Sequence, residues 1–235
     1  MKKILFVLFL LCGCRGIVVP DSFRYKEIET GTYKLASWQK ITNNTGPIRI
    51  YIEGDGYAFN HLGQPTTNPT PRGTFLREVA FNDSNPNVVY LARACQFVDD
   101  KRCTQKDWTT GRFSQGIIDA TTQAIKEISG KQPIILIGYS GGALLSGLVI
   151  EQNPKLPVKK WITIAGVLNH TSWTNYFNDA PLVDSVDLEK MPKVDQIHFV
   201  GEKDKIIPLE LAKKWSEVQV IQNATHDSGW NELNF

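Results

Sequence analysis

The stretch from Ile134 to Gly142 reads Ile-Ile-Leu-Ile-Gly-Tyr-Ser-Gly-Gly and is the most informative part of the sequence. It opens with an unbroken apolar run. A run without alternating polar positions predicts a strand buried on both faces, which is typical of the middle of a parallel sheet. A helical pattern begins directly afterwards, at Ala143. The chain is therefore expected to pass from a central strand into a helix through a tight glycine-rich turn centred on Ser140.

The same alternation of strand and helix continues on both sides of this turn. Apolar positions from Phe113 to Ile128 share one helical face, Gly130 ends that helix, and another helix opens at Pro208. Short apolar runs predict strands at residues 38–41, 48–52, 88–91, 134–137, 161–164, 197–200 and 218–221. We expect an α/β fold in which helices flank a mostly parallel central sheet, as a single domain over residues 33–235.

Composition excludes several other classes of protein. The chain has 235 residues, of which 42% are hydrophobic and 21% charged, as in an ordinary folded domain rather than a disordered chain. No pattern recurs with the period of about 20–50 residues that marks solenoids and propellers. The net charge is only +2 and no basic cluster is present, so we expect no nucleic-acid partner.

The turn around Ser140 has the pattern G-x-S-x-G in its required place between a strand and a helix. Such a sharp reversal strains the backbone of the serine and leaves no room for side chains two residues away on either side. Gly138 and Gly142 supply that room in the nucleophile elbow. The Ser140 hydroxyl would project above the sheet, and the N–H of Gly141 would face a developing oxyanion.

An acid and a histidine follow the serine at the ends of later strands. Asp204 comes after the strand at 197–200, and His226 comes after the strand at 218–221. With these residues in this order the sequence resembles the α/β-hydrolase superfamily over residues 33–235. The resemblance implies acyl transfer in which Ser140 is the nucleophile, His226 the base and Asp204 its orienting acid. It implies no metal and no organic cofactor.

Competing assignments for the acid and the base are open but weaker. Glu202 lies two residues before Asp204, although Asp204 fits the Gly-x-x-Asp spacing of the superfamily. His198 lies within a predicted strand, and the remaining histidines lie in earlier loops.

The second oxyanion donor should come from the loop after the strand at 48–52. That loop often reads His-Gly in the superfamily, but here it reads Glu53-Gly54-Asp55-Gly56. The N–H of Asp55 or Gly56 could donate to the oxyanion. A free Asp55 carboxylate would oppose the developing negative charge, so we expect its side chain to face away from the site or to be paired.

The N-terminus has the pattern of an export signal. Lys2 and Lys3 precede a short apolar run, and Leu-Cys-Gly-Cys at residues 11–14 resembles a bacterial lipobox. The resemblance implies a lipoprotein signal peptide at 1–13, a lipid-modified Cys14 that anchors the chain to a membrane, and a tether at 14–32. Arg15 replaces the aspartate that retains lipoproteins in the inner membrane, which favours the outer membrane or another outward-facing part of the cell envelope.

Two cysteines remain in the exported part of the chain. Cys95 and Cys103 are eight residues apart, and in an oxidising compartment such a pair is expected to form a disulfide. No histidine lies near either cysteine, so a zinc site is not expected.

These features together predict a lipid-anchored serine hydrolase, with a carboxylic ester or thioester of a small molecule as its substrate. A non-catalytic surface lipoprotein on the same scaffold and an envelope acyltransferase or peptidase remain as alternatives, because fold and triad do not choose among them. Residues 165–192 are long enough for a small cap, and their aromatics Trp173, Tyr176 and Phe177 could line an acyl pocket or simply pack locally. The sequence does not specify the oligomeric state.

Overall fold

A computed structural model describes residues 18–231 and 233. Its eight strands form one sheet in the order β1-β2-β4-β3-β5-β6-β7-β8. The first two strands and the β2–β4 pair are antiparallel, and all pairs from β4 through β3 to β8 are parallel. The strands are β1 Arg24–Glu29, β2 Lys34–Ile41, β3 Ile48–Ile52, β4 Asn87–Leu91, β5 Ile134–Tyr139, β6 Val158–Ile164, β7 Asp195–Gly201 and β8 Gln219–Ile221.

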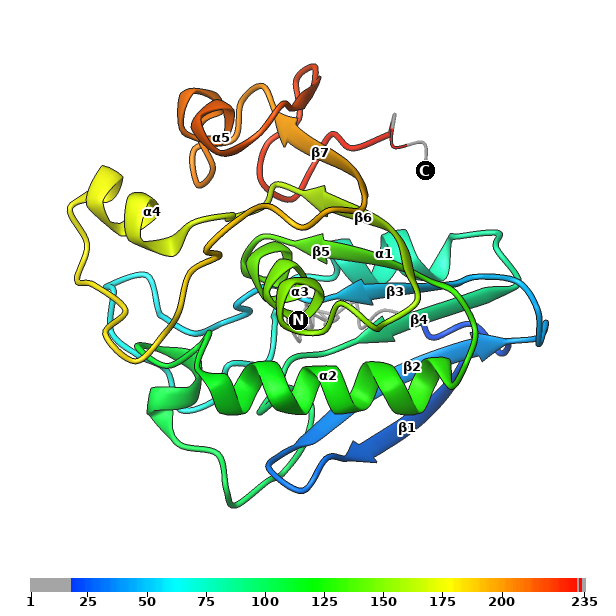
Figure 1. The fold of residues 1–235 in the computed structure, drawn as a ribbon. Coiled ribbons are helices and arrows are strands. Elements are labelled where there is room, and N and C mark those ends of the chain that lie inside the picture. The colour runs from blue at the N-terminus through cyan, green and yellow to red at the C-terminus, as the bar shows by residue number, and fades with distance from the viewer. Residues whose placement is uncertain (1–17, 232, 234–235) are drawn as a thin grey trace, which may run out of the picture.

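Helices cover both faces of this sheet. The long helices α2 and α3 lie on one face, and the short α1 lies behind it in the view of Figure 1. The helices are α1 Phe75–Phe81, α2 Gln115–Ser129, α3 Gly141–Gln152, α4 His170–Phe177 and α5 Leu209–Trp215, and a short 3-10 helix spans Gln105–Trp108. The expected α/β architecture with its mostly parallel sheet is confirmed.

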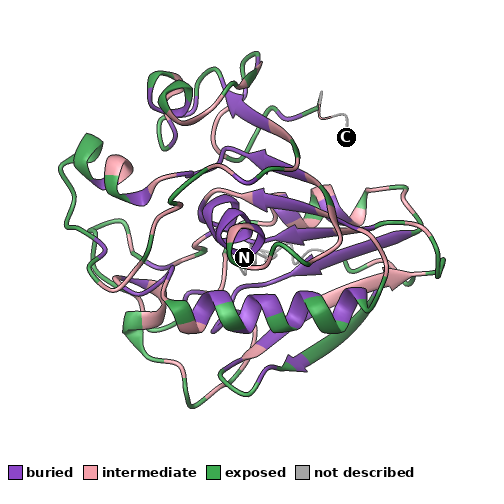
Figure 2. Ribbon diagram, in the orientation of Figure 1, coloured by how far each residue is buried: buried purple, intermediate pink, exposed green. Residues whose placement is uncertain are grey.

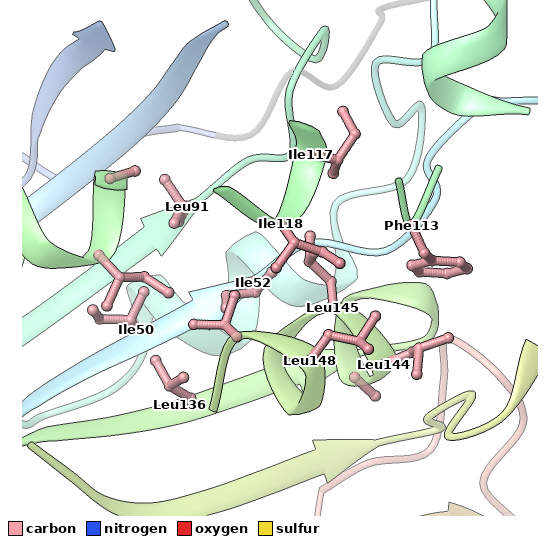
Figure 3. Packing of buried hydrophobic residues seen from close by; sticks show 14 of the residues in the cluster. Ile50, Ile52, Leu91, Phe113, Ile117, Ile118, Leu136, Leu144, Leu145 and Leu148 are labelled. Atoms are coloured by element: carbon pink, nitrogen blue, oxygen red, sulfur yellow. The ribbon is translucent and has the colours of Figure 1, made fainter. Parts of the chain in front are cut away.

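Helices α2 and α3 differ in how their apolar residues are distributed, and burial explains the difference. Buried and exposed residues alternate along α2 in Figure 2, because only one of its faces packs on the protein. Helix α3 is buried on nearly every side, as its apolar and small residues require. Between them, Ile118 of α2 meets Leu145 and Leu148 of α3 over Ile52 of β3 (Figure 3). This packing fixes the start of α3, and therefore Ser140, against the sheet.

The prediction that residues 14–32 form a tether is wrong for the part of this segment that forms a strand. Arg24–Glu29 forms β1, which pairs with β2 in register from Arg24 opposite Gln39 to Glu29 opposite Lys34. Of the six residues of this edge strand, Ile28 alone is buried, so the sequence lacks the apolar alternation that predicts a strand. The predicted signal peptide and Cys14 lie outside the described residues.

Residues 165–192, considered above for a cap, contain α4 and otherwise irregular chain. No helix within residues 18–231 is both long enough and apolar enough to cross a membrane.

Candidate active site

The turn between β5 and α3 holds Ser140 in a backbone conformation that non-glycine residues seldom adopt, with φ 51° and ψ −122°. Three backbone hydrogen bonds hold it there. The Ser140 N–H donates to the Ile164 carbonyl at 3.0 Å, and the Ser140 carbonyl accepts from the N–H groups of Ala143 and Val167, each at 3.1 Å. The end of β6 and the chain that follows it therefore stabilise the strained turn.

The glycines on either side of Ser140 are required by space. A Cβ atom on Gly138 would overlap the backbone of Gly142 and Ala143, and a Cβ on Gly142 would overlap the carbonyl groups of Ile52 and Glu53. Backbone atoms obstruct both positions, so moving the one side chain involved, that of Ser146, would not make room. This geometry matches the steric reason for which both glycines were predicted.

The structure brings together the three residues that the sequence places at the ends of separate strands. Ser140 Oγ lies 3.1 Å from Nε2 of His226, and Nδ1 of His226 lies 3.0 Å from Oδ2 of Asp204. Because β5, β7 and β8 are part of one parallel array, the turns that follow them lie at the same edge of the sheet. The imidazole therefore bridges a hydroxyl and a carboxylate in one hydrogen-bonded chain.

The Asp204 carboxylate is firmly oriented. Its side chain is fully buried, and its Oδ1 accepts hydrogen bonds from the backbone N–H groups of Ile206 and Ile207 at 2.8 and 2.9 Å. These bonds leave Oδ2 directed at His226. The alternative acid, Glu202, instead accepts the Asn223 N–H at 2.9 Å.

Loop residues after β3 form the other side of the site. A Cβ atom on Gly54 would lie 3.0 Å from the Cβ of Ser140, so this glycine gives the serine its close approach to the loop. Gly56 adopts a left-handed conformation with φ 65° and packs against Pro69. Gly54 was not among the predicted site residues, although its place directly after a strand and before Asp55 was a usable signal.

The Asp55 side chain is paired, which is one of the two arrangements expected for it from the sequence. Its Oδ1 accepts from Nη1 of Arg93, and its Oδ2 accepts from Nη1 of Arg112 at 2.8 Å. Burial by itself would raise the pKa of the Asp55 carboxyl, but the guanidinium groups of Arg112 and Arg93 outweigh it and hold that pKa below its ordinary value. Asp55 is therefore an ion within a cation-rich cluster.

Glu53 lies beneath this loop. Burial raises the pKa of its carboxyl, while hydrogen bonds from the Tyr90 hydroxyl at 2.6 Å and the Gly54 N–H at 2.8 Å act in the opposite direction. Both contacts fix the backbone at the start of the loop that faces Ser140.

A pocket of about 710 Å³ opens above Ser140 and His226. Its walls come from the 53–59 and 71–78 segments, from Arg112 and Phe113, and from Trp173 and Leu182 of the long connection after β6. Of the three aromatics predicted as pocket candidates, Trp173 lines this space, whereas Tyr176 and Phe177 are outside the lining and are partly exposed.

Other residues singled out in the sequence have structural positions. His198 is buried in β7 between Thr163 and Gln196, and burial lowers its pKa to about 4. Cys95 and Cys103 form a disulfide. No group of three or more His, Cys, Asp or Glu side chains in the described part of the chain is arranged to hold a metal ion.

Two pocket residues were assigned no role in the site from the sequence. His170, the first residue of α4, lines the pocket although it was considered only as an early loop histidine. Arg112 also lines it. The sequence signal for Arg112 was indirect: Asp55 was expected to be paired if it faced the site, but no particular cation was indicated as its partner.

Comparison with known proteins identifies the fold. No family model and no curated protein matches the sequence. Among solved structures, E-2-(acetamidomethylene)succinate hydrolase superposes with a TM-score of 0.58 at 14% identity, covering 87% of this chain and 92% of that one. Est1E from Butyrivibrio proteoclasticus gives a TM-score of 0.57 at 13% identity, covering 86% and 90%.

A third structure, an α/β serine hydrolase homologue from Coxiella burnetii, gives a TM-score of 0.54 at 16% identity over 90% of this chain and 92% of that one. These neighbours match over nearly their whole length. Together with the strand order, they establish that this chain has the α/β-hydrolase fold. At such low identity the likeness is one of fold, so the chemistry has to be argued from the site itself.

Proposed function

We propose that the protein is a serine hydrolase that cleaves a carboxylic ester or thioester through an acyl-enzyme on Ser140. One observation carries the proposal: the hydrogen-bonded chain from Ser140 Oγ through His226 to the buried Asp204 carboxylate, at the floor of an open pocket. A serine hydroxyl is a weak nucleophile by itself, and this chain supplies the base that it needs.

The geometry supports the following sequence of steps. Ser140 Oγ attacks the carbonyl carbon while Nε2 of His226 takes its proton. Asp204 accepts a hydrogen bond from the Nδ1–H of His226, which fixes the tautomer and stabilises the imidazolium. His226 then gives the proton to the departing alcohol or thiol, and a water molecule attacks the acyl-enzyme by the same route in reverse.

The tetrahedral oxyanion would be held by two backbone N–H groups. Gly141 at the start of α3 supplies the first. For the second we propose Asp55 rather than Gly56, because the peptide between Gly54 and Asp55 directly follows the glycine that contacts Ser140. With its carboxylate neutralised by two arginines, Asp55 can present its N–H without repelling the oxyanion.

A hydrolysis assay on short methyl esters, in which the released acid is measured by titration, tests this function. The wild-type chain should turn these esters over, and Ser140→Ala should lose turnover while keeping its melting temperature. Product formation with added alcohols or amines in place of water would instead identify an acyltransferase, and no turnover by a folded wild-type chain would favour a binding protein.

We also propose that the chain is exported and anchored to a membrane through Cys14, on the lipobox resemblance described above. The mass of the N-terminal peptide of protein purified from membranes tests this. A peptide that begins at a diacylglyceryl-modified Cys14 would support it, and an unmodified N-terminus at another residue would contradict it.

A further inference from the structure

One wall of the pocket carries a buried cation. Arg112 precedes α2, lines the pocket and is 7% exposed. Its Nη1 donates to Asp55, whereas its buried Nε has no hydrogen-bond partner within the described residues. A guanidinium offers five N–H donors in a planar fork. Arg112 therefore keeps donor capacity that the protein itself does not use.

The cluster around Arg112 has an excess of positive charge. Two guanidinium groups, those of Arg93 and Arg112, form ion pairs with the single Asp55 carboxylate, so these three side chains carry two positive charges and one negative. Glu53 also acts on Arg93, but burial raises the pKa of its carboxyl and so favours its uncharged form. Arg93 is 5% exposed, and its second nitrogen donates to the Arg112 carbonyl. A buried excess charge is costly unless a counter-charge can approach, and the pocket gives an anion that access.

The other acids of the pocket make no ion pair with Arg112, although the charge of Glu53 acts on Arg93. Both carboxylate oxygens of Glu53 accept hydrogen bonds, from Gly54 and from Tyr90. Glu78 belongs to α1 and accepts a hydrogen bond from the Thr74 hydroxyl. Asp227 directly follows His226 in the chain. None of these acids forms an ion pair with Arg112.

His170 lies on the same wall as Arg112. Its ring stacks on Phe113, with centroids 5.8 Å apart and planes 9° apart. The residue is 5% exposed, its Nε2 lies 3.6 Å from Asp187, and the Ser185 backbone lies within reach of the ring. Burial and the charge of Arg112 lower the pKa of His170, whereas Asp187 acts in the opposite direction.

This wall adjoins the reacting atoms. A Cβ atom on Gly141 would overlap the Asp55 carboxylate and would lie 3.0 Å from Nη1 of Arg93. The cation cluster therefore borders the proposed oxyanion site. The leaving group has to lie beside His226, which gives it a proton, so the cluster is placed for the acyl part of a substrate.

We propose that Arg112, with His170 beside it, binds a carboxylate in the acyl part of the substrate, so that the preferred substrates are half-esters or half-thioesters of short dicarboxylic acids. The inference rests on the proposed hydrolase function and names its substrate class. A carboxylate fits better than a phosphate, because its single charge matches the one excess positive charge of the cluster.

A matched pair of esters tests the proposal. Monomethyl glutarate and methyl valerate have acyl chains of the same carbon number and differ in a terminal carboxylate. Wild-type kcat/KM should favour the glutarate ester by about tenfold or more, since a charged hydrogen bond in a desolvated pocket has that effect. Arg112→Met should lower this preference about 10- to 100-fold, and Arg112→Lys should retain part of it.

The ratio of the two substrates separates recognition from general damage, because a disturbed Ser140 would slow both. Arg72 gives a matched control: it also lines the pocket, but its guanidinium carbon lies 3.5 Å from the centroid of the Tyr57 ring. Arg72→Met should leave the ratio unchanged. An equal effect from Arg72→Met would overturn the assignment to Arg112, because any nearby positive charge would then serve.

Failure of the inference and failure of the hydrolase function give different results. Equal rates on both esters would overturn the carboxylate subsite but still support the hydrolase function. This comparison uses the wild-type protein alone, so it does not depend on whether a variant folds. If neither ester reacts, calorimetry with free glutarate on the Ser140→Ala protein decides. Binding that Arg112→Lys weakens would support the subsite without the chemistry. Absence of binding, or equally tight binding of inorganic phosphate, would overturn it.

Discussion

Removing the carboxylate of Asp55 should destabilise the protein strongly, because that carboxylate separates two arginines. In the Asp55→Ala variant, Arg93 and Arg112 would lose their shared acceptor and would remain as two uncompensated cations, with side chains only 5% and 9% exposed. Breaking a buried ion pair by removing one partner costs about 3–5 kcal/mol. The Asp55 side chain is itself 27% exposed, so we expect the lower end, about 3 kcal/mol.

Urea unfolding followed by tryptophan fluorescence measures this change, with the disulfide kept oxidised. The double variant Asp55→Ala/Arg112→Met removes one of the two stranded cations. Its loss of free energy of unfolding should therefore be smaller than the sum of the losses of the two single variants, by about 1–3 kcal/mol. Glu127→Ala is the control, because its ion pair with Lys26 is exposed on both sides and its loss should have little effect. A loss below about 1 kcal/mol in Asp55→Ala, or strict additivity in the double variant, would refute this reasoning.

Three further predictions concern the elbow, the core and the disulfide. Gly142→Ala should abolish ester turnover and lower the free energy of unfolding by about 1–3 kcal/mol, because the new methyl group would overlap the backbone at the end of β3. A variant that stays active and stable would contradict this prediction. The pKa of His198 is lowered from 6.5 to about 4, so the unfolded chain takes up the proton first, and stability falls as the pH drops from 6.5 towards 4. The melting temperature of the His198→Gln variant should therefore depend less on pH over that range. The melting temperature of the control His61→Gln, at an exposed position, should follow that of the wild type. Reducing the Cys95–Cys103 bond should destabilise by about 2–3 kcal/mol, and a melting temperature unchanged by reductant would argue against a stabilising role.

The parts of the fold that sequence could predict are those fixed by local pattern. The central strand β5 and the helix α3 have long apolar runs, and the turn between them needs glycine at Gly138 and Gly142 for steric reasons that act within a few residues. Asp204 and His226 could be found because each follows a parallel strand, and parallel strands end at a common edge.

The features that sequence did not predict depend on contacts between distant segments. Strand β1 is polar at most positions and is held by its pairing with β2, so no periodicity marks it. The partners of Asp55 lie 38 and 57 residues away in the chain, and nothing in the local sequence selects Arg93 and Arg112 over the other basic residues. His170 reaches the pocket only through the path of the chain after β6.

The central claim is that Ser140 is an activated nucleophile, and covalent labelling tests it most directly. A chain starting at Arg15 would be treated with a fluorophosphonate, which phosphonylates an activated serine with loss of fluoride, and the adduct would be located by peptide mass spectrometry. We predict an adduct on Ser140 that is absent from the Ser140→Ala protein and is slowed by His226→Ala. A folded wild-type protein that acquires no adduct, or acquires it at another residue, would contradict the account.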